Sequence, residues 1–248
     1  MKQFSIFFCF LICACASQAQ FAIVPANARQ SALGGCRLLP DDSTRIEVSY
    51  RCGYGLKAMS TRLLSASVNT GALGTAHGLF SHFGDADYGE MQAAAGYSMR
   101  VSERFSVGVE GRYCRLSLAD GRYPSRQWLA MAARVRMRVS DYLSLSLSGG
   151  TRPWDEGRPF CLRAAMAWQP VSGLLALAEV ESEERPRMRL GMEYAYRGHF
   201  FFRAGLSTAP VIVAFGLGVR YCRYIVDVAA ESHPTLGLTP QISLALCL

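Results

Sequence analysis

The sequence predicts an all-β fold: a transmembrane antiparallel β-barrel of about 14 strands, with a short N-terminal segment at or in its mouth. Three observations predict it. Half of the 248 residues are hydrophobic, but they lie in short alternating runs along the whole chain. The longest apolar run, residues 209–219, has 11 residues and includes a proline and two glycines, whereas a membrane-spanning helix needs about 20. Charged residues alternate with the apolar ones, as they do when one strand face meets lipid.

Residues 1–19 read as a secretory signal peptide, with Lys2 as the positive start, an apolar stretch over 4–16 and a small-x-small cleavage pattern at 17–19. Cys15 leaves a lipoprotein alternative open. Residues 20–43 form an N-terminal segment, expected to contain a short helix over 26–35 that ends at two glycines, followed by a turn at 40–42. The barrel is expected over residues 44–248. The segment either enters the barrel mouth or hangs in the periplasm.

From residue 44 onward, extended segments of about 9–11 residues, the length that a tilted membrane strand requires, alternate with turn residues. The expected strands are 44–52, 59–69, 71–82, 89–101, 104–118, 127–140, 142–151, 160–169, 174–182, 187–197, 199–208, 211–222, 223–232 and 239–248. The alternation is clearest in 142–151, where Leu and Ser take turns. Short turns and longer connections follow one another, which is typical of outer-membrane barrels.

One strand face carries nearly all the charge. An arginine or lysine that meets lipid at mid-depth costs about 2–4 kcal/mol, so we expect these side chains to face the lumen. They share a face with the small polar residues of their strands: Glu47, Arg51, Glu110, Arg112, Arg134, Arg136, Arg138, Glu179, Glu181, Arg187, Arg189, Glu193, Arg203, Arg220 and Asp227. The mixture of signs favours a rigid, salt-bridged interior over a selective ion channel.

The closing segment 241–248 is expected to be the strand that closes the barrel and carries the insertion signal. Its outward face is formed by Ile242, Leu244, Leu246 and Leu248, because alternate side chains of a strand point to opposite sides. Closing the barrel removes an open edge that lipid cannot satisfy.

No motif for catalysis, a metal or a cofactor appears, so an enzyme is not expected and no cofactor is predicted. His77 and His82 are five positions apart, which puts them on opposite faces of one strand. The six cysteines after the leader form no CxxC pair, and disulfide bridges or simple space-filling are both open. The 25 basic and 19 acidic residues after the leader are dispersed, unlike the clustered patch of a nucleic-acid binder.

Four stretches resemble the PorV/PorQ-like outer-membrane proteins, relatives of FadL-type barrels in bacteria with a type IX secretion system. They are ANARQSALGG at 26–35, YGLKAMST at 54–61, SHFG at 81–84 and SHPTLGLTPQISL at 232–244. The resemblance covers nearly all of the mature chain and implies a fourteen-stranded barrel whose N-terminal segment lies at or inside the mouth. The chain is shorter than a FadL-type transporter, and it ends in Leu248 where such barrels usually end in an aromatic residue.

The function expected first is a passive outer-membrane conduit for hydrophobic or small solutes, as the FadL-type resemblance implies. The alternative is a non-conducting scaffold of a type IX-like secretion pathway, and an outer-membrane enzyme ranks third. The expected location is the bacterial outer membrane, and the expected state is a monomer. The expected partners are outer-membrane lipid and lipopolysaccharide, the barrel-assembly machinery, and hydrophobic small molecules or secretion components, but not nucleic acid.

Overall fold

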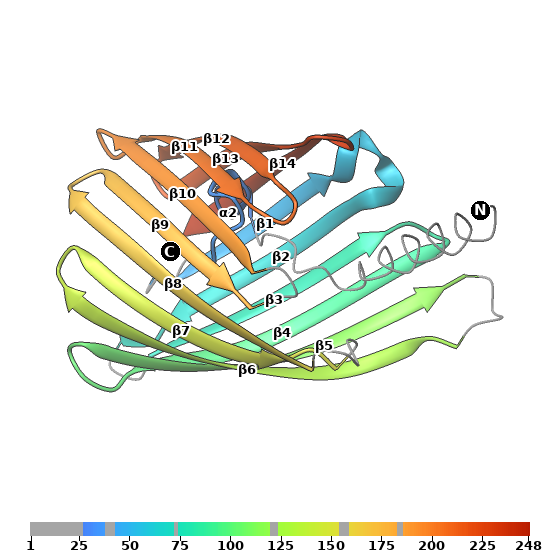
Figure 1. Cartoon of the computed structure of the whole chain (residues 1–248), viewed down its shortest axis with the longest axis horizontal. Coiled ribbons are helices and arrows are strands. Elements are labelled where there is room, and N and C mark those ends of the chain that lie inside the picture. Colours follow the sequence, from blue (N-terminus) through green and yellow to red (C-terminus); the bar gives the residue numbers. More distant parts are fainter. Residues whose placement is uncertain (1–26, 38–42, 72–73, 120–123, 154–158, 183–185) are drawn as a thin grey trace, which may run out of the picture.

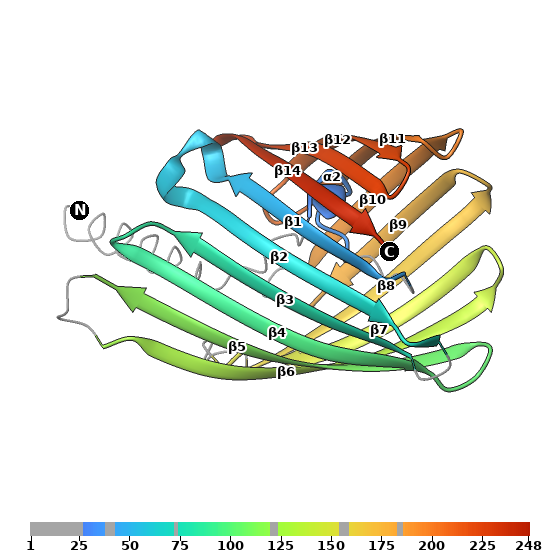
Figure 2. The same ribbon diagram turned by 180° about the vertical axis from the view of Figure 1, so that it is seen from behind.

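Fourteen antiparallel strands close into one barrel, shown from two opposite sides in Figures 1 and 2. The computed structural model describes residues 27–37, 43–71, 74–119, 124–153, 159–182 and 186–248. Each strand pairs with its neighbours in sequence, and β1 also pairs with β14. The predicted fold class, an antiparallel β-barrel of about 14 strands, is therefore confirmed. The expected signal peptide and the expected turn at 40–42 lie outside the described residues.

The strands follow the alternating segments of the sequence closely. Their bounds are β1 (Arg45–Cys52), β2 (Ser60–Asn69), β3 (Thr75–Gly84), β4 (Tyr88–Arg100), β5 (Phe105–Leu118), β6 (Arg126–Ser140), β7 (Leu143–Thr151), β8 (Phe160–Val171), β9 (Leu174–Glu181), β10 (Arg187–Tyr196), β11 (Phe200–Ser207), β12 (Ile212–Tyr221), β13 (Tyr224–His233) and β14 (Gly237–Cys247). Two short 3₁₀ turns, η1 (Gly53–Gly55) and η2 (Lys57–Met59), connect β1 to β2. In the described part of the N-terminal segment, one helix, α2 (Ala28–Ala32), precedes the barrel.

Local hydrogen bonds of short polar side chains explain where several strands end. Ser102 Oγ accepts the backbone N–H of Arg104 and of Phe105 and so fixes the β4–β5 turn. Asp85 Oδ1 accepts the N–H of Asp87 and of Tyr88 between β3 and β4. Serine and aspartate favour turns because their side chains bond to nearby backbone in this way.

The ring closes where β14 lies beside β1. Seven residue pairs join the two strands, from Arg45 opposite Cys247 to Arg51 opposite Gln241. Closure leaves no strand with an unpaired row of backbone groups, which is the condition for a sheet to exist in hydrocarbon.

Apolar side chains alternate onto the outer surface of the barrel. On β14, Ile242 and Leu244 are exposed and Leu246 is half-buried, whereas Ser243 and Ala245 between them are buried. Leu248, directly after the strand, is also exposed. On β7, Leu145 and Leu147 are exposed in the same way. None of the helices in the described ranges is long and apolar enough to cross a membrane.

Candidate functional site

The N-terminal segment packs inside the barrel against one side of its wall. We call residues 27–37 the plug. In both views α2 lies next to β11–β14 and away from β5–β7 (Figures 1 and 2), and its contacts are with β11, β12, β13 and β14. Asn27 begins the helix by accepting the N–H of Gln30 at 2.8 Å, a role for which asparagine is among the best residues.

Glycines on three neighbouring strands make room for the plug. Gly191, Gly205 and Gly216 lie on β10, β11 and β12, and a Cβ atom added to any of them would collide with residues 32–34. At Gly191 the added atom would stand 2.9 Å from the Cβ of Leu33. The barrel wall is therefore shaped to let the plug backbone approach closely, which only glycine permits.

Polar groups hold the plug in this cradle. The guanidinium of Arg29 donates to both carboxylate oxygens of Glu193, each at 2.8 Å. Ser31 Oγ donates to Glu231 at 2.6 Å, and Asn27 Nδ2 donates to Glu47 at 3.0 Å. A bidentate arginine–carboxylate pair has a fixed geometry as well as a favourable energy, so these contacts set the position of the plug.

The barrel wall carries three groups of ion pairs on the side of the plug. Glu179 and Glu181 each bind both Arg163 and Arg189, over distances of 2.6–3.1 Å. Arg203 bridges Glu193 and Asp227, at 2.6 Å to each carboxylate. Arg51 binds Glu231 at 2.6 Å. Because each of these charges is paired, the three groups can remain buried at tolerable cost.

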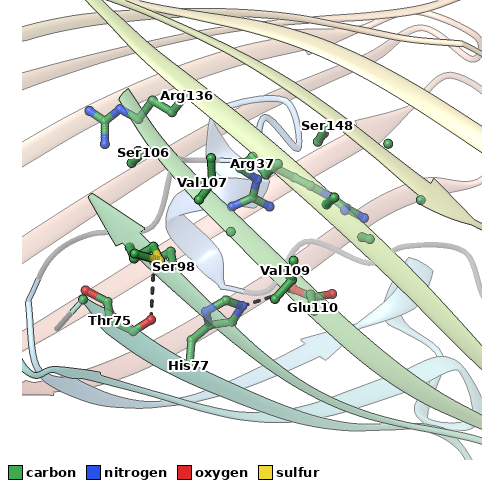
Figure 3. A pocket seen from close by; sticks show the side chains of 18 of the residues that line it. Arg37, Thr75, His77, Ser98, Ser106, Val107, Val109, Glu110, Arg136 and Ser148 are labelled. Atoms are coloured by element: carbon green, nitrogen blue, oxygen red, sulfur yellow. Dashed lines mark hydrogen bonds and ion pairs between the residues drawn. The ribbon is translucent and has the colours of Figure 1, made fainter. Parts of the chain in front are cut away.

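The opposite side of the interior contains a cavity of about 540 Å³, and we call it the arginine cavity. Nine arginines and two glutamates line it among the described residues: Arg37, Arg100, Arg104, Arg112, Arg134, Arg136, Arg138, Arg152, Arg163, Glu103 and Glu110. Serines on β5 and β7 lie opposite arginines of the neighbouring strands: Ser106 opposite Arg100 and Arg136, and Ser148 opposite Arg134 and Arg163. Figure 3 shows both serines in the lining. Among the nine arginines, Arg112 is paired with Glu110 and both Arg152 and Arg163 with Glu181, and the described lining still contains more arginines than carboxylates.

His77 and Glu110 form a polar contact within this cavity. The Nε2 atom of His77 lies 3.3 Å from Glu110, and Arg112 donates to the same carboxylate at 2.7 Å. Figure 3 shows His77 directed at Glu110, with Arg37 and Arg136 around the same space. Gly96 on β4 leaves room for the imidazole, since a Cβ atom there would overlap the ring. Glu110 offsets only part of the positive charge of the arginines that line the cavity.

The structure divides the fifteen predicted lumen residues into three groups. Ten take part in the ion pairs just described or in the bonds that fix the plug: Glu47, Arg51, Glu110, Arg112, Glu179, Glu181, Arg189, Glu193, Arg203 and Asp227. Arg134, Arg136 and Arg138 line the arginine cavity. Arg187 donates to the backbone oxygen of Ala209, and Arg220 lies over the ring of Phe201.

Several residues of the site were missed by sequence reasoning. Arg163 and Glu231 share the strand face of the charges that were chosen, so alternation alone would have found them. Arg29 and Arg37 belong to the plug, where no period predicts an orientation. His77 was interpreted as a polar residue near a strand end, and its contact with Glu110 on β5 depends on the pairing of β3, β4 and β5.

Neither a disulfide nor a metal site is found among the described residues. All six cysteines of the described ranges are free thiols: Cys36, Cys52, Cys114, Cys161, Cys222 and Cys247. No group of three or more His, Cys, Asp or Glu side chains in the described ranges is placed to hold a metal ion. Of the two alternatives left open for the cysteines, bridging is not seen.

Comparison with solved structures places the fold among outer-membrane barrels. The chain resembles the CymD monoaromatic hydrocarbon channel (TM-score 0.64, 9% identity, covering 92% of this chain and 99% of that one). It also resembles the outer membrane protein Omp33 of Acinetobacter baumannii (TM-score 0.61, 6% identity, 83% and 98% covered). A third similar structure is the toluene transporter TbuX of Ralstonia pickettii (TM-score 0.60, 10% identity, 89% and 97% covered).

These identities establish a shared fold and nothing narrower. No protein-family model and no curated protein matches the sequence. The relation to FadL-type barrels and the closer one to PorV/PorQ-like proteins stay predictions.

Proposed function

We propose that this protein lies in the bacterial outer membrane and is a passive conduit for small solutes, which pass through the arginine cavity beside the plug. The single observation that carries this proposal is a cavity of about 540 Å³ inside a closed barrel. The apolar outer surface suits hydrocarbon. The similar folds of two proteins titled as a channel and a transporter add support.

The course of the cavity supports a path that enters the barrel from one end. Its lining begins at Ser102–Arg104, in the turn between β4 and β5, and extends inward to Arg112 on β5, Ala130 on β6 and Thr151 at the end of β7. The β4–β5 turn is at one end of the strands, whereas Thr151 lies beside Met131, near the middle of the longer strand β6. The plug narrows the lumen from the β10–β14 side and leaves this route beside it.

The chemistry of the lining bears on the expected solute. The sequence resemblance implies hydrophobic or small solutes, and two of the similar structures are a toluene transporter and a monoaromatic hydrocarbon channel. A hydrocarbon gains nothing from guanidinium groups, which would have to give up water without a partner. Of the two solute types, the cavity favours small polar molecules.

A non-conducting scaffold of a secretion pathway is the second candidate, and the plug is the observation that favours it. Its bonds to Glu47, Glu193 and Glu231 and its glycine cradle fix a filled half-lumen. A scaffold needs a rigid barrel but no open path. In either case we propose insertion by the barrel-assembly machinery through the closing segment 241–248, whose outward face carries Ile242, Leu244, Leu246 and Leu248.

Planar-bilayer recording of the purified mature protein distinguishes the two candidates. A conduit gives steady openings whose conductance changes when Arg134, Arg136 and Arg138 are replaced by alanine, because these side chains line the path. Silent membranes that contain folded protein, verified by heat-modifiable migration on a gel, would contradict the conduit and favour the scaffold.

A further inference from the structure

The arrangement of charge inside the barrel points to a ligand class. We infer that the arginine cavity is a binding site for small soluble oxyanions, molecules with carboxylate or phosphate groups, and that the conduit is selective for them. The inference rests on the proposed function for its transport part, whereas the binding site stands on the structure of the cavity.

The first argument is the separation of charge within one lumen. Most acidic side chains of the wall lie on β9, β10 and β13, where Glu179, Glu193 and Asp227 are paired with arginines. The cavity wall built from β4–β7 carries Arg100, Arg104, Arg112, Arg134, Arg136 and Arg138, with only Glu103 and Glu110 among the described residues that line it. An interior that served only to stiffen the barrel through ion pairs would not require more arginines than carboxylates on one wall.

Arg37 supplies a second, independent observation. The plug carries its side chain into the cavity (Figure 3), while its backbone N–H is held by Glu179 at 2.9 Å. The Nη2 atom of Arg37 is buried and has no hydrogen-bond partner among the residues described. A buried charged donor without an acceptor is costly, and an oxyanion in the cavity would provide the acceptor.

The surroundings of Arg37 are buried and contain other cations. Burial lowers the pKa of Arg37 well below the ordinary arginine value, the neighbouring charges of Arg163 and Arg112 lower it further, and Glu181 and Glu179 act in the opposite direction. An anion beside these arginines would offset the repulsion among them, because opposite charges stabilise the ionised form.

Size and geometry suit a small organic anion. Ligand cavities usually enclose about 300–1,000 Å³, and this one encloses about 540 Å³. The planar guanidinium donates two parallel hydrogen bonds to a carboxylate or a phosphate, which lysine cannot do. The cavity contains arginine and no lysine, so its groups are suited to oxyanions and not merely to negative charge.

Alternate positions on one strand place three of these arginines in a row. Arg134, Arg136 and Arg138 lie on β6, opposite Ser148, Ser146 and Ser144 of β7. Serine is short, so the facing strand leaves space beside these arginine side chains. Such a row could pass an oxyanion from one site to the next, the multi-site arrangement that conduction requires.

Selectivity and block in planar bilayers test the inference. In a potassium chloride gradient, the reversal potential of the wild-type protein should be shifted toward the equilibrium potential of chloride. Millimolar citrate should reduce the chloride current. Replacing Arg134, Arg136 and Arg138 by serine should abolish both effects while openings persist. The matched control removes the same charge from exposed arginines outside the cavity, Arg62, Arg197 and Arg223.

A charge-conserving triple variant, with lysine at positions 134, 136 and 138, separates a site from a diffuse positive field. It should keep anion preference but lose most of the citrate block, since lysine lacks the bidentate fork. Inorganic phosphate and uncharged sucrose, added in place of citrate, show whether any oxyanion binds and whether size alone blocks.

The possible results test the oxyanion site separately from the conduit. Openings without anion preference and without citrate block would overturn the oxyanion site and leave the conduit standing. If the membranes are silent, calorimetric titration of citrate into the detergent-solubilised protein decides the site alone. Binding that the serine variant loses would support the site, and no binding to the wild type would overturn it.

Discussion

At the scale of single residues, adjacent positions of one strand meet opposite surroundings. Leu147 on β7 is exposed on the outer surface, and the neighbouring Ser146 points inward opposite Arg136 of β6. The same side chain introduced at either position therefore tests which face meets lipid.

Replacing Leu147 by arginine should reduce the stability of the inserted barrel by about 2–4 kcal/mol, the cost of a guanidinium facing lipid near mid-depth. Replacing Ser146 by arginine should cost much less, because the added charge stays in an interior that holds a polar cavity. The measurement is the denaturant dependence of the folded fraction in lipid vesicles. Equal losses for the two variants would contradict the assignment of faces.

At the scale of elements, the position of the plug depends on glycines of distant strands. Gly205 on β11 contacts the backbone around Leu33 and Gly34 so closely that a Cβ atom has no room. Gly111 on β5 has open space at the corresponding atom and is exposed. The two glycines therefore form a matched pair for substitution.

Gly205→Val should displace the plug and raise the single-channel conductance several-fold, because the space that residues 32–34 occupy becomes available to solute. Gly111→Val should leave conductance and plug position unchanged. Recording both variants in the same bilayers provides the comparison. If Gly205→Val folds normally and conducts like the wild type, the plug does not limit the path.

The elements themselves could largely be predicted from the sequence, because each strand is specified by its own alternation and by its turns. Leu and Ser over 142–151 predicted β7, observed at Leu143–Thr151, almost to the residue. The third strand was expected over 71–82 and is observed at Thr75–Gly84, because Gly- and Ala-rich sequence gives little alternation to read. Strand existence is thus a local property.

The candidate site could be predicted only in part. The inward charges follow from period two, but the docking of the plug does not. It requires Gly191, Gly205 and Gly216 to meet residues 32–34 across more than 150 positions of sequence, and no local pattern reports that contact. The burial of the Nη2 atom of Arg37 could not be predicted either, because it depends on the plug lying inside the closed barrel.

At the scale of the whole molecule, the pairing of β1 with β14 closes the barrel and separates its polar interior from the surrounding lipid. Glu47 on β1 and Glu231 on β13 hold the same plug from either side of the β1–β14 seam, so this pair of contacts depends on β1 and β14 meeting. The seam joins the two ends of the barrel sequence, so it forms only when the other strands are in place.

A disulfide across the seam tests both closure and register. Val48 and Leu244 lie opposite one another and face outward. Directly opposed residues have Cα atoms about 4.5–5.5 Å apart, within the range for a disulfide. In a chain whose six mature cysteines are changed to alanine, Val48→Cys with Leu244→Cys should form a bond on mild oxidation, and the circular product should migrate differently on a non-reducing gel.

The control pair shifts the register by one residue, with Val48→Cys and Ala245→Cys. Because Ala245 is buried on the inner face while Val48 is on the outer face, its thiol should not reach the partner. Bonding of the shifted pair and not of the direct pair would mean a one-residue slip of β14. Such a slip would turn Gln241 and Ser243 outward toward lipid and Leu244 inward, so it would undo the outer surface on which membrane placement depends.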